Sequence, residues 1–170
     1  MAEPARLTLV LGGARSGKSA HAEALLAALP PPWLYIATAE PLDNEMAARI
    51  AAHRGRRDPR WRTVEAPRDL AGALGAADGA SLLVDCLTLW LSNLMLDDAD
   101  LDHEIARLED ALARMRGTAV LVANEVGLGI VPDNALARKF RDAAGRLNQR
   151  LAARAENVVL LVAGIPVKVK

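Results

Sequence analysis

The chain has 170 residues, of which 21 are basic and 21 acidic, and 52% of its residues are apolar while only 3% are aromatic. This length predicts a single domain over residues 1–170 with a core of aliphatic side chains, and the zero net charge argues against a general nucleic-acid binder. Cys86 is the only cysteine and no segment resembles a signal peptide or a membrane span, so we expect a cytoplasmic protein without disulfides.

Short apolar runs alternate with longer helical patterns along the chain. Strands are predicted at residues 7–11, 33–37, 61–65, 81–85, 119–123 and 158–162, and a short end strand could lie at 167–169. Helices are predicted at residues 18–29, 43–54, 68–76, 87–96, 102–116 and 134–155. Continuous apolar strands are typical of a parallel sheet covered on both faces, and their alternation with helices predicts a doubly wound α/β fold.

The first predicted strand runs into a glycine-rich turn. Residues 12–19 read GGARSGKS and match the pattern G-x-x-x-x-G-K-S/T in full, after a strand and at the start of a helix. Such glycines let consecutive backbone N–H groups form a nest for phosphate, and the helix N-terminus adds further donors. Lys18 is expected to reach the outer phosphates, and the hydroxyl of Ser19 to ligate Mg²⁺. The predicted phosphate-binding residues are Gly12, Gly13, Ala14, Arg15, Ser16, Gly17, Lys18 and Ser19.

A histidine and several arginines gather in the next segment, residues 43–65. His53 follows Met46 and Ile50 at helical spacing, so it shares a stripe with expected core residues, which favours a partly buried structural histidine. A largely unprotonated imidazole beside guanidinium groups is also what a nucleophile that attacks phosphorus needs. Spacing alone leaves both interpretations open. The arginines near this histidine are Arg54, Arg56, Arg57, Arg60 and Arg62.

The apolar run SLLVD, residues 81–85, ends in an acid. In proteins with a phosphate loop, an acid at the end of such a strand lies beside the loop and holds the metal, usually through water. Asp85 is therefore the candidate metal carboxylate. The alternative is an ordinary helix cap, because the following residues could also begin a helix.

The stretch 120–152 contains a strand end at Asn124 and Glu125, a glycine-containing loop through Pro132, and the clearest helical pattern in the chain. Loops at the carboxyl ends of strands line the ligand crevice in open α/β sheets, so Asn124 and Glu125 are expected to face the same cleft as the phosphate loop. A loop whose glycines merely permit a turn is the other interpretation. In the helix that follows, one face is predicted from Leu136, Phe140, Ala144, Leu147 and Leu151, with Asp133 as a candidate cap.

These motifs together resemble a known family, the bifunctional adenosylcobinamide kinase / adenosylcobinamide-phosphate guanylyltransferase of cobalamin biosynthesis. The resemblance covers nearly the whole chain. It is carried, in order, by GGARSGKS, YIATAE, DNEMAARIAAHRGRR, WRTVE, NEVGLGIVP and FRDAAGRLNQRLA. The phosphate loop is shared by many nucleotide enzymes, whereas NEVGLGIVP and the pairing of RIAAH with WRTVE are far more specific.

The resemblance implies a RecA-like P-loop NTPase fold, with a mostly parallel central sheet of about six or seven strands flanked by helices. It also implies two reactions. ATP or GTP first phosphorylates the aminopropanol hydroxyl of adenosylcobinamide. GTP then donates GMP to that phosphate through a guanylylated histidine, giving adenosyl-GDP-cobinamide. Mg²⁺ is the implied cofactor, and a homotrimer is the implied assembly. The zero net charge and the lack of a long apolar window lead us to expect no nucleic-acid partner and no membrane span.

The same resemblance carries functional residues onto this sequence. His53 matches the guanylylated histidine, and Lys18 acts with the phosphate loop. Asp85 falls where some relatives have Glu, which leaves direct metal ligation open. The kinase general base stays open between Asp85 and Glu125. The further nucleotide contacts are Ala37, Thr38, Ala39, Arg54, Gly55, Arg56, Arg57 and Glu65.

Two other functions remain to be weighed. A RecA-like ATPase module would use the same phosphate loop to move a partner and would form no covalent intermediate. A family member that retains only one of the two activities would keep the phosphate loop unchanged. Labelling with GTP that carries the label in its α-phosphate separates these alternatives.

Overall fold

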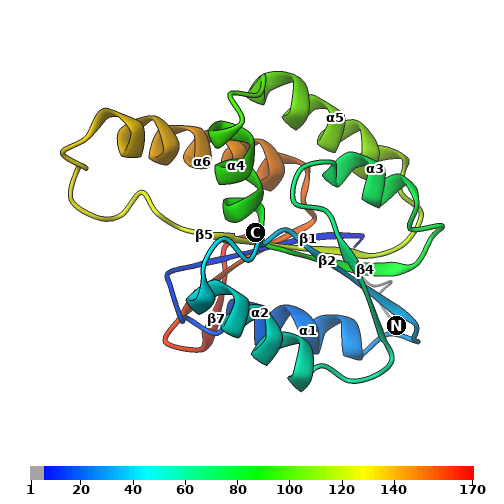
Figure 1. Cartoon of the computed structure of the whole chain (residues 1–170). Coiled ribbons are helices and arrows are strands. Elements are labelled where there is room, and N and C mark those ends of the chain that lie inside the picture. Colours follow the sequence, from blue (N-terminus) through cyan, green and yellow to red (C-terminus); the bar gives the residue numbers. More distant parts are fainter. Residues whose placement is uncertain (1–5) are drawn as a thin grey trace.

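A seven-stranded sheet in the order β3-β2-β4-β5-β1-β6-β7 forms the centre of the molecule (Figure 1). The computed structural model describes residues 6–170, apart from the side chains of Arg49, His53 and Arg56. All strand pairs are parallel except β6 with β7. The strands are β1 (Leu7–Gly12), β2 (Trp33–Ala37), β3 (Trp61–Glu65), β4 (Ser81–Asp85), β5 (Ala119–Asn124), β6 (Asn157–Val162) and β7 (Ile165–Lys168).

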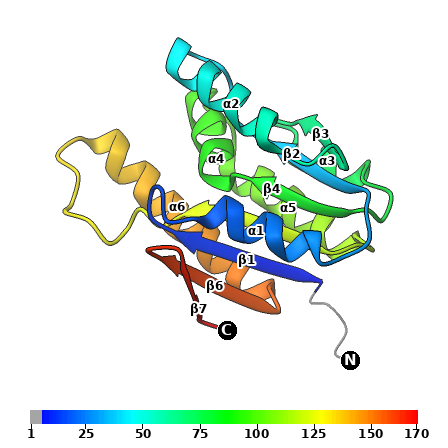
Figure 2. The same cartoon turned by 90° about the horizontal axis from the view of Figure 1, so that it is seen from below.

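Helices cover both faces of this sheet. In Figure 1, α1 and α2 lie on one side, and α3, α4, α5 and α6 lie on the other. The same two layers can be followed from below in Figure 2. The helices are α1 (Lys18–Ala27), α2 (Asn44–Arg56), α3 (Leu70–Gly75), α4 (Leu87–Leu96), α5 (Leu101–Arg114) and α6 (Ala135–Arg154). This is the doubly wound α/β fold that the sequence predicts.

The sheet separates two apolar cores because side chains alternate along each strand. On β2, Leu34 and Ile36 point into the larger core, with α3 to α6, while Trp33 and Tyr35 point into the smaller one, with α1. Both cores are built mainly from aliphatic residues, as expected from a composition with few aromatics. A sheet buried on both faces leaves its carboxyl edge as the natural place for ligands.

The sheet ends in a hairpin that lies against the phosphate loop. Val162 pairs with Ile165 across a two-residue turn, in which Ala163 and Gly164 have φ values of 51° and 80°. Positive φ at both positions is typical of the tight turns that join antiparallel strands. The N–H of Gly164 donates to the carbonyl oxygen of Ser16 at 2.9 Å. The C-terminal hairpin therefore holds one side of the phosphate loop.

The predicted elements are all present, with small differences at their ends. The last strand occupies 165–168, somewhat before the expected 167–169. The expected cap Asp133 is wrong, because Asn134 directly precedes α6 and its side chain accepts from the N–H of Ala137 at 2.7 Å. Leu136 was expected on the buried face but is 63% exposed, since the buried residues of α6 begin only at Ala143.

Candidate active site

The phosphate loop joins β1 to α1 in a conformation that only glycine tolerates at two positions. At Gly12 the φ angle is 157°, and a Cβ there would stand 2.5 Å from Ser16 Oγ and 2.8 Å from the carbonyl oxygen of Leu161. Gly17 precedes α1 with a φ of 94°, in the left-handed region that other residues rarely adopt. The glycines of the sequence motif are thus required by the backbone itself.

Two polar side chains at the phosphate loop are buried away from water. Lys18 is 7% exposed, and its Nζ donates to the carbonyl oxygen of Gly13 at 2.5 Å. Burial lowers the pKa of Lys18, while the nearby Cys86 and Asp85 act in the opposite direction. Ser16 Oγ is buried and has no hydrogen-bond partner among the described residues. A phosphate bound in the loop would give both groups an anionic partner.

Asp85 lies at the carboxyl end of β4, two strands away from β1. Its half-buried carboxylate accepts a hydrogen bond from the hydroxyl of Tyr35, with a distance of 2.8 Å between Tyr35 Oη and Asp85 Oδ2. Burial raises the pKa of Tyr35 well above its ordinary value, and the charge of Asp85 adds to this effect. The phenol of Tyr35 therefore stays protonated, and its hydroxyl is the donor in this hydrogen bond.

The strand end at Asn124 and Glu125 lies directly beside the phosphate loop. The N–H of Glu125 donates to the carbonyl oxygen of Gly12 at 3.0 Å, and the N–H of Asn124 donates to Thr88 Oγ1 at 2.7 Å. Glu125 Oε1 in turn accepts from the N–H of Gly127 at 2.6 Å. The segment therefore lies next to the phosphate loop, while its place in a common cleft and its chemical role stay predictions.

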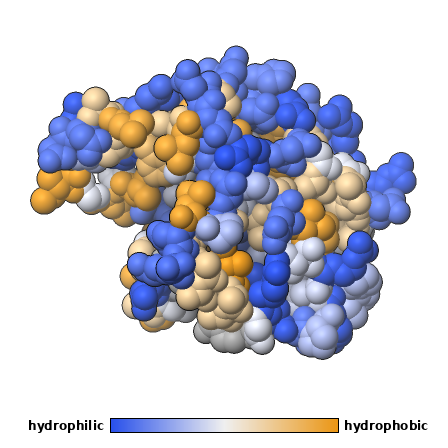
Figure 3. Space-filling model, viewed as in Figure 1, coloured by the Kyte–Doolittle hydropathy of each residue, from blue (hydrophilic) through white to orange (hydrophobic). Residues whose placement is uncertain are grey.

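The loop that follows β5 exposes an unusual amount of apolar surface. Leu128, Ile130 and Val131 are 84%, 97% and 63% exposed. In Figure 3, hydrophobic residues gather at the end of the molecule where this loop and the start of α6 project from the body. Monomeric proteins rarely expose such contiguous apolar side chains, which often mark an interface.

Thr38 fixes the segment between β2 and α2 against β4. It is fully buried, and its hydroxyl accepts from the N–H of Cys86 at 2.8 Å and donates to the carbonyl oxygen of the same residue at 2.7 Å. The side chain of Asn93 donates to the carbonyl oxygen of Thr38 at 2.9 Å. Its predicted neighbours Ala37 and Ala39 are half-buried. These bonds attach the start of the 37–39 segment to the strand that carries Asp85.

Helix α2 carries His53, whose side chain lies outside the described residues. The helix begins after Asp43, which accepts from the N–H of Met46 at 2.7 Å. Met46 and Ile50 are only half-buried and belong to neither apolar core, so the expected stripe of core residues on this helix is wrong. The structure thus removes the packing argument for a structural histidine, while the role of His53 stays a prediction.

Two of the arginines after His53, Arg54 and Arg57, bind side chains of the edge strand β3. Arg54 forms an exposed ion pair with Glu65 at 2.6 Å. Arg57 donates from Nη1 to Thr63 Oγ1 at 2.9 Å, and its guanidinium lies 3.3 Å from the centre of the Tyr35 ring. Predicted nucleotide contacts from α2 and β3 are thereby brought together. Gly55 is exposed, and the side chain of Arg56 lies outside the described residues.

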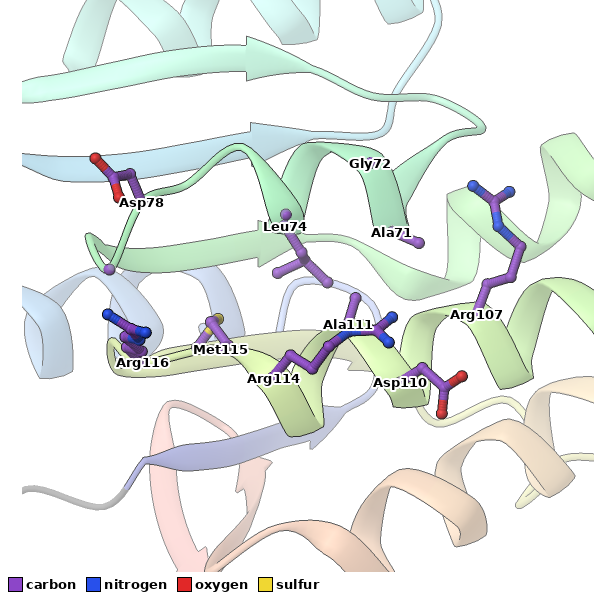
Figure 4. Close-up of a pocket in the computed structure, with 12 residues that line it drawn as sticks. Ala71, Gly72, Leu74, Asp78, Arg107, Asp110, Ala111, Arg114, Met115 and Arg116 are labelled. Carbon is purple, nitrogen blue, oxygen red and sulfur yellow. The ribbon is translucent and has the colours of Figure 1, made fainter.

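A groove of the described residues lies elsewhere on the protein. It has a volume of about 520 Å³ and lies between α3 and α5, where Leu74, Ala111 and Met115 contribute apolar surface and Arg107, Arg114 and Arg116 surround them (Figure 4). No residue of the phosphate loop lines it. Its rim includes Asp78 and Gly79, directly before β4, so it lies at the amino end of that strand, opposite Asp85. This groove is therefore separate from the candidate active site at the phosphate loop.

Comparison with known proteins identifies the family. Residues 8–169 match the family described as cobinamide kinase / cobinamide phosphate guanyltransferase. The chain belongs to this family. It is 51% identical over 166 residues to the bifunctional adenosylcobalamin biosynthesis protein CobP of Pseudomonas aeruginosa, covering 95% of this chain and 96% of that protein. It is 48% identical over 181 residues to the protein CobU of Salmonella typhimurium, covering 96% and 99%.

Solved structures support the fold of this kinase / guanyltransferase family member. The flagellar accessory protein FlaH of Methanocaldococcus jannaschii matches with a TM-score of 0.54 at 10% identity, over 97% of this chain and 78% of the other. An ATPase of a bacterial type III secretion system matches with a TM-score of 0.55 at 10% identity, over 92% and 51%. At such low identity the likeness concerns the fold alone, and it confirms the predicted RecA-like architecture.

Sequence reasoning missed three residues that shape this site. Tyr35, Thr88 and Asn93 bind Asp85, Asn124 and the backbone of Thr38, respectively. The one available signal was that Tyr35 is the first residue of the quoted YIATAE motif. Periodicity treats all three positions as buried and gives no information about the partner of a buried hydroxyl or amide.

Proposed function

We propose that this chain phosphorylates the aminopropanol hydroxyl of adenosylcobinamide and then converts the product to adenosyl-GDP-cobinamide with GTP. The observation that carries this proposal is a complete phosphate loop with buried Lys18 and an unpartnered Ser16 Oγ, in a member of the cobinamide kinase / guanyltransferase family. Both reactions are assigned to one domain spanning residues 1–170.

In the kinase step, the substrate hydroxyl oxygen attacks the γ-phosphorus of ATP or GTP, and the bond to the β-phosphate oxygen breaks. Residues 12–19 hold the phosphates through backbone N–H groups, and Lys18 neutralises charge that develops on the leaving nucleoside diphosphate. The hydroxyl proton passes to Asp85 or Glu125, which both lie beside the loop. Asp85 interacts electrostatically with Lys18, and Glu125 is bonded to Gly12 through its N–H.

In the transferase step, an imidazole nitrogen of His53 attacks the α-phosphorus of GTP, and pyrophosphate leaves. A phosphate oxygen of adenosylcobinamide phosphate then attacks the same phosphorus, and the N–P bond breaks to restore the imidazole. The arginines at the end of α2, with Ala37, Thr38, Ala39 and Glu65, are the proposed nucleotide contacts. Their positions along β2, β3 and α2 support one continuous nucleotide surface.

Mg²⁺ fits the donors present beside the phosphate loop. Asp85 offers a half-buried carboxylate of which one oxygen is bound by Tyr35, and the hydroxyl of Ser19 lies in the first turn of α1. Among the described residues, no group of three or more His, Cys, Asp and Glu could hold an ion by itself. The ion would therefore keep waters and phosphate oxygens, as Mg²⁺ does at nucleotide sites, and when bound it neutralises phosphate charge.

We further propose a homotrimer in the cytoplasm, without nucleic-acid partners. The exposed apolar side chains of residues 128–131 support an interface between copies of the chain. The zero net charge supports the absence of nucleic acid, and a lone buried Cys86 supports a reducing compartment. Within residues 6–170, no helix has the length and apolar character needed to cross a membrane.

Labelling with GTP that carries the label in its α-phosphate tests the transferase. Incubated with Mg²⁺ and denatured, the wild type should retain label that is labile in acid and stable in base, as expected for a phosphoramidate. His53→Ala should carry none, while His103→Ala, changed at an exposed position in α5, should be labelled like the wild type. Unlabelled wild type, or a labelled His53→Ala, overturns the proposed intermediate.

Phosphate transfer to cobinamide tests the kinase separately. Lys18→Ala should abolish it, because Lys18 is the buried cation of the loop that is expected to reach the outer phosphates. A circular-dichroism spectrum and a melting curve like those of the wild type would show that the fold is retained. Full activity of Lys18→Ala would exclude the phosphate loop from this step.

A further inference from the structure

Tyr35 has a position in the sheet from which its side chain reaches the end of the neighbouring strand. In the parallel pair of β2 and β4, Tyr35 is the partner of Leu83, and Asp85 follows two residues later. Residues two apart in a strand lie on the same face, so Tyr35 and Asp85 are diagonal neighbours on the face covered by α1. A side chain as long as tyrosine spans such a diagonal.

The hydroxyl at the tip of this side chain restrains a carboxylate. Tyr35 is 4% exposed, and its hydroxyl donates to Asp85 Oδ2 at 2.8 Å. Rotating the carboxylate away would break this bond and leave the buried hydroxyl without that acceptor, which is unfavourable. Asp85 is therefore held with one oxygen engaged by Tyr35, and no hydrogen bond to its other oxygen is found among the described residues.

The ring of Tyr35 is itself fixed on two sides. The guanidinium of Arg57 lies 3.3 Å from the ring centre, and Trp61 meets the ring edge-on, with centroids 6.1 Å apart and an interplanar angle of 81°. A phenylalanine would fill the same space and keep both contacts. What distinguishes tyrosine here is the hydroxyl, and the acceptor that it serves is the proposed metal carboxylate.

We propose that Tyr35 is a positioning residue for the metal site: its hydroxyl holds Asp85 in the orientation that binds hydrated Mg²⁺ at the phosphate loop. This inference rests on the proposed role of Asp85. Tyr35 touches neither nucleotide nor metal, and it acts by reducing the conformational freedom that Asp85 would lose when the ion binds. The ring contacts of Arg57 and Trp61 keep the hydroxyl in place.

Nucleotide affinity measured with and without Mg²⁺ tests this role without relying on activity. The variant is Tyr35→Phe, which keeps the ring and removes the hydroxyl. We expect its dissociation constant for GTP in Mg²⁺ to rise about tenfold, since the variant loses a hydrogen bond to a charged group that water replaces only in part. In EDTA the dissociation constant should stay within about twofold of the wild type, because the phosphate loop is unchanged.

The kinase reaction gives a second measurement. In Tyr35→Phe, the Mg²⁺ concentration for half-maximal rate should rise about tenfold, and the maximal rate should recover at high Mg²⁺. If Tyr35 only fills the core, Tyr35→Phe would leave the Mg²⁺ dependence unchanged, because the phenylalanine ring fills the same space. That result overturns the inference.

Asp85→Asn and the double variant separate this inference from the proposed function. If Tyr35 acts through Asp85, Tyr35→Phe should add nothing to the loss already caused by Asp85→Asn. Additive effects would overturn the positioning role of Tyr35 and leave Asp85 as the metal carboxylate. An Asp85→Asn variant with normal Mg²⁺ dependence would instead refute the metal role of Asp85, and this inference with it.

Discussion

Replacing Glu109 would test how strongly α5 and α6 are held together above the sheet. The Glu109 side chain is 9% exposed, accepts from Arg150 at 2.9 and 2.7 Å, and lies 3.3 Å from Arg154. Removing one partner of a fully buried ion pair costs about 3–5 kcal/mol. Arg150 and Arg154 are 36% and 47% exposed, so water hydrates their guanidinium groups once the negative charge of Glu109 is removed. We therefore expect Glu109→Gln to lower the free energy of unfolding by about 2 kcal/mol.

Urea unfolding at pH 7 measures this loss, and a melting curve should show a decrease of about 4–8 °C. Glu104→Gln is the matched control, because Glu104 pairs with Arg107 one turn along the same helix. Pairs within one helix contribute about 0.5 kcal/mol or less. A loss below about 0.5 kcal/mol for Glu109→Gln would refute the reasoning, because it would make the cluster equivalent to a surface pair.

The pH dependence of the free energy of unfolding gives an independent test of this ion pair. The hydrogen bonds from Arg150, which outweigh the effect of burial, hold the pKa of Glu109 below its ordinary value of 4.5. A depressed pKa means that the ionised carboxylate stabilises the fold above about pH 4.5, and that this contribution is lost as the pH falls through the lower folded-state pKa. The difference between wild type and Glu109→Gln should thus be constant near neutrality and shrink in acid. A difference that grows in acid would contradict this assignment.

Two further predictions concern the backbone around the site. Thr38→Val keeps the shape of the side chain but leaves the buried N–H and carbonyl oxygen of Cys86 without their hydroxyl partner. Urea unfolding should therefore show a free energy of unfolding that is lower by about 3 kcal/mol. An unchanged midpoint would contradict this. Ala163 adopts a left-handed φ of 51°, which costs about 1–2 kcal/mol for a residue with a Cβ. Glycine removes this strain, but its greater freedom in the unfolded chain offsets about 0.5–1 kcal/mol of the gain. Ala163→Gly should therefore raise the melting temperature slightly while the bond from Gly164 to Ser16 persists, and a lower melting temperature would show that the turn is unstrained.

Some features of the site are local in sequence and could be predicted from it. The phosphate loop needs glycine where φ is positive, and the close approach of Ser16 Oγ to Gly12 is decided within a few residues. The strand ends at Asp85 and Asn124 are marked by a change from apolar to polar residues. Because parallel strands place their carboxyl ends at one edge, the order of elements along the chain was sufficient to bring these ends together.

Other expectations failed where they depended on packing between distant segments. Periodicity placed Met46 and Ile50 in the core, but α2 connects β2 to the edge strand β3, and its apolar residues enter neither core. Leu136 likewise fits the buried stripe of α6 by spacing, although the first turns of the helix project beyond the covered sheet. The spacing of residues defines the face of a helix, whereas burial depends on what that face meets.

The sequence by itself determined the class of fold, the phosphate loop and the family of the chain, because these follow from short-range backbone preferences and from the order of strands and helices. Only the tertiary structure decided that Tyr35 reaches Asp85 and that Arg57 covers the tyrosine ring. These contacts join β2, β4 and the end of α2, and their geometry depends on strand register and on side-chain length. A hydrogen bond requires a match within a few tenths of an ångström, which only the packed sheet provides.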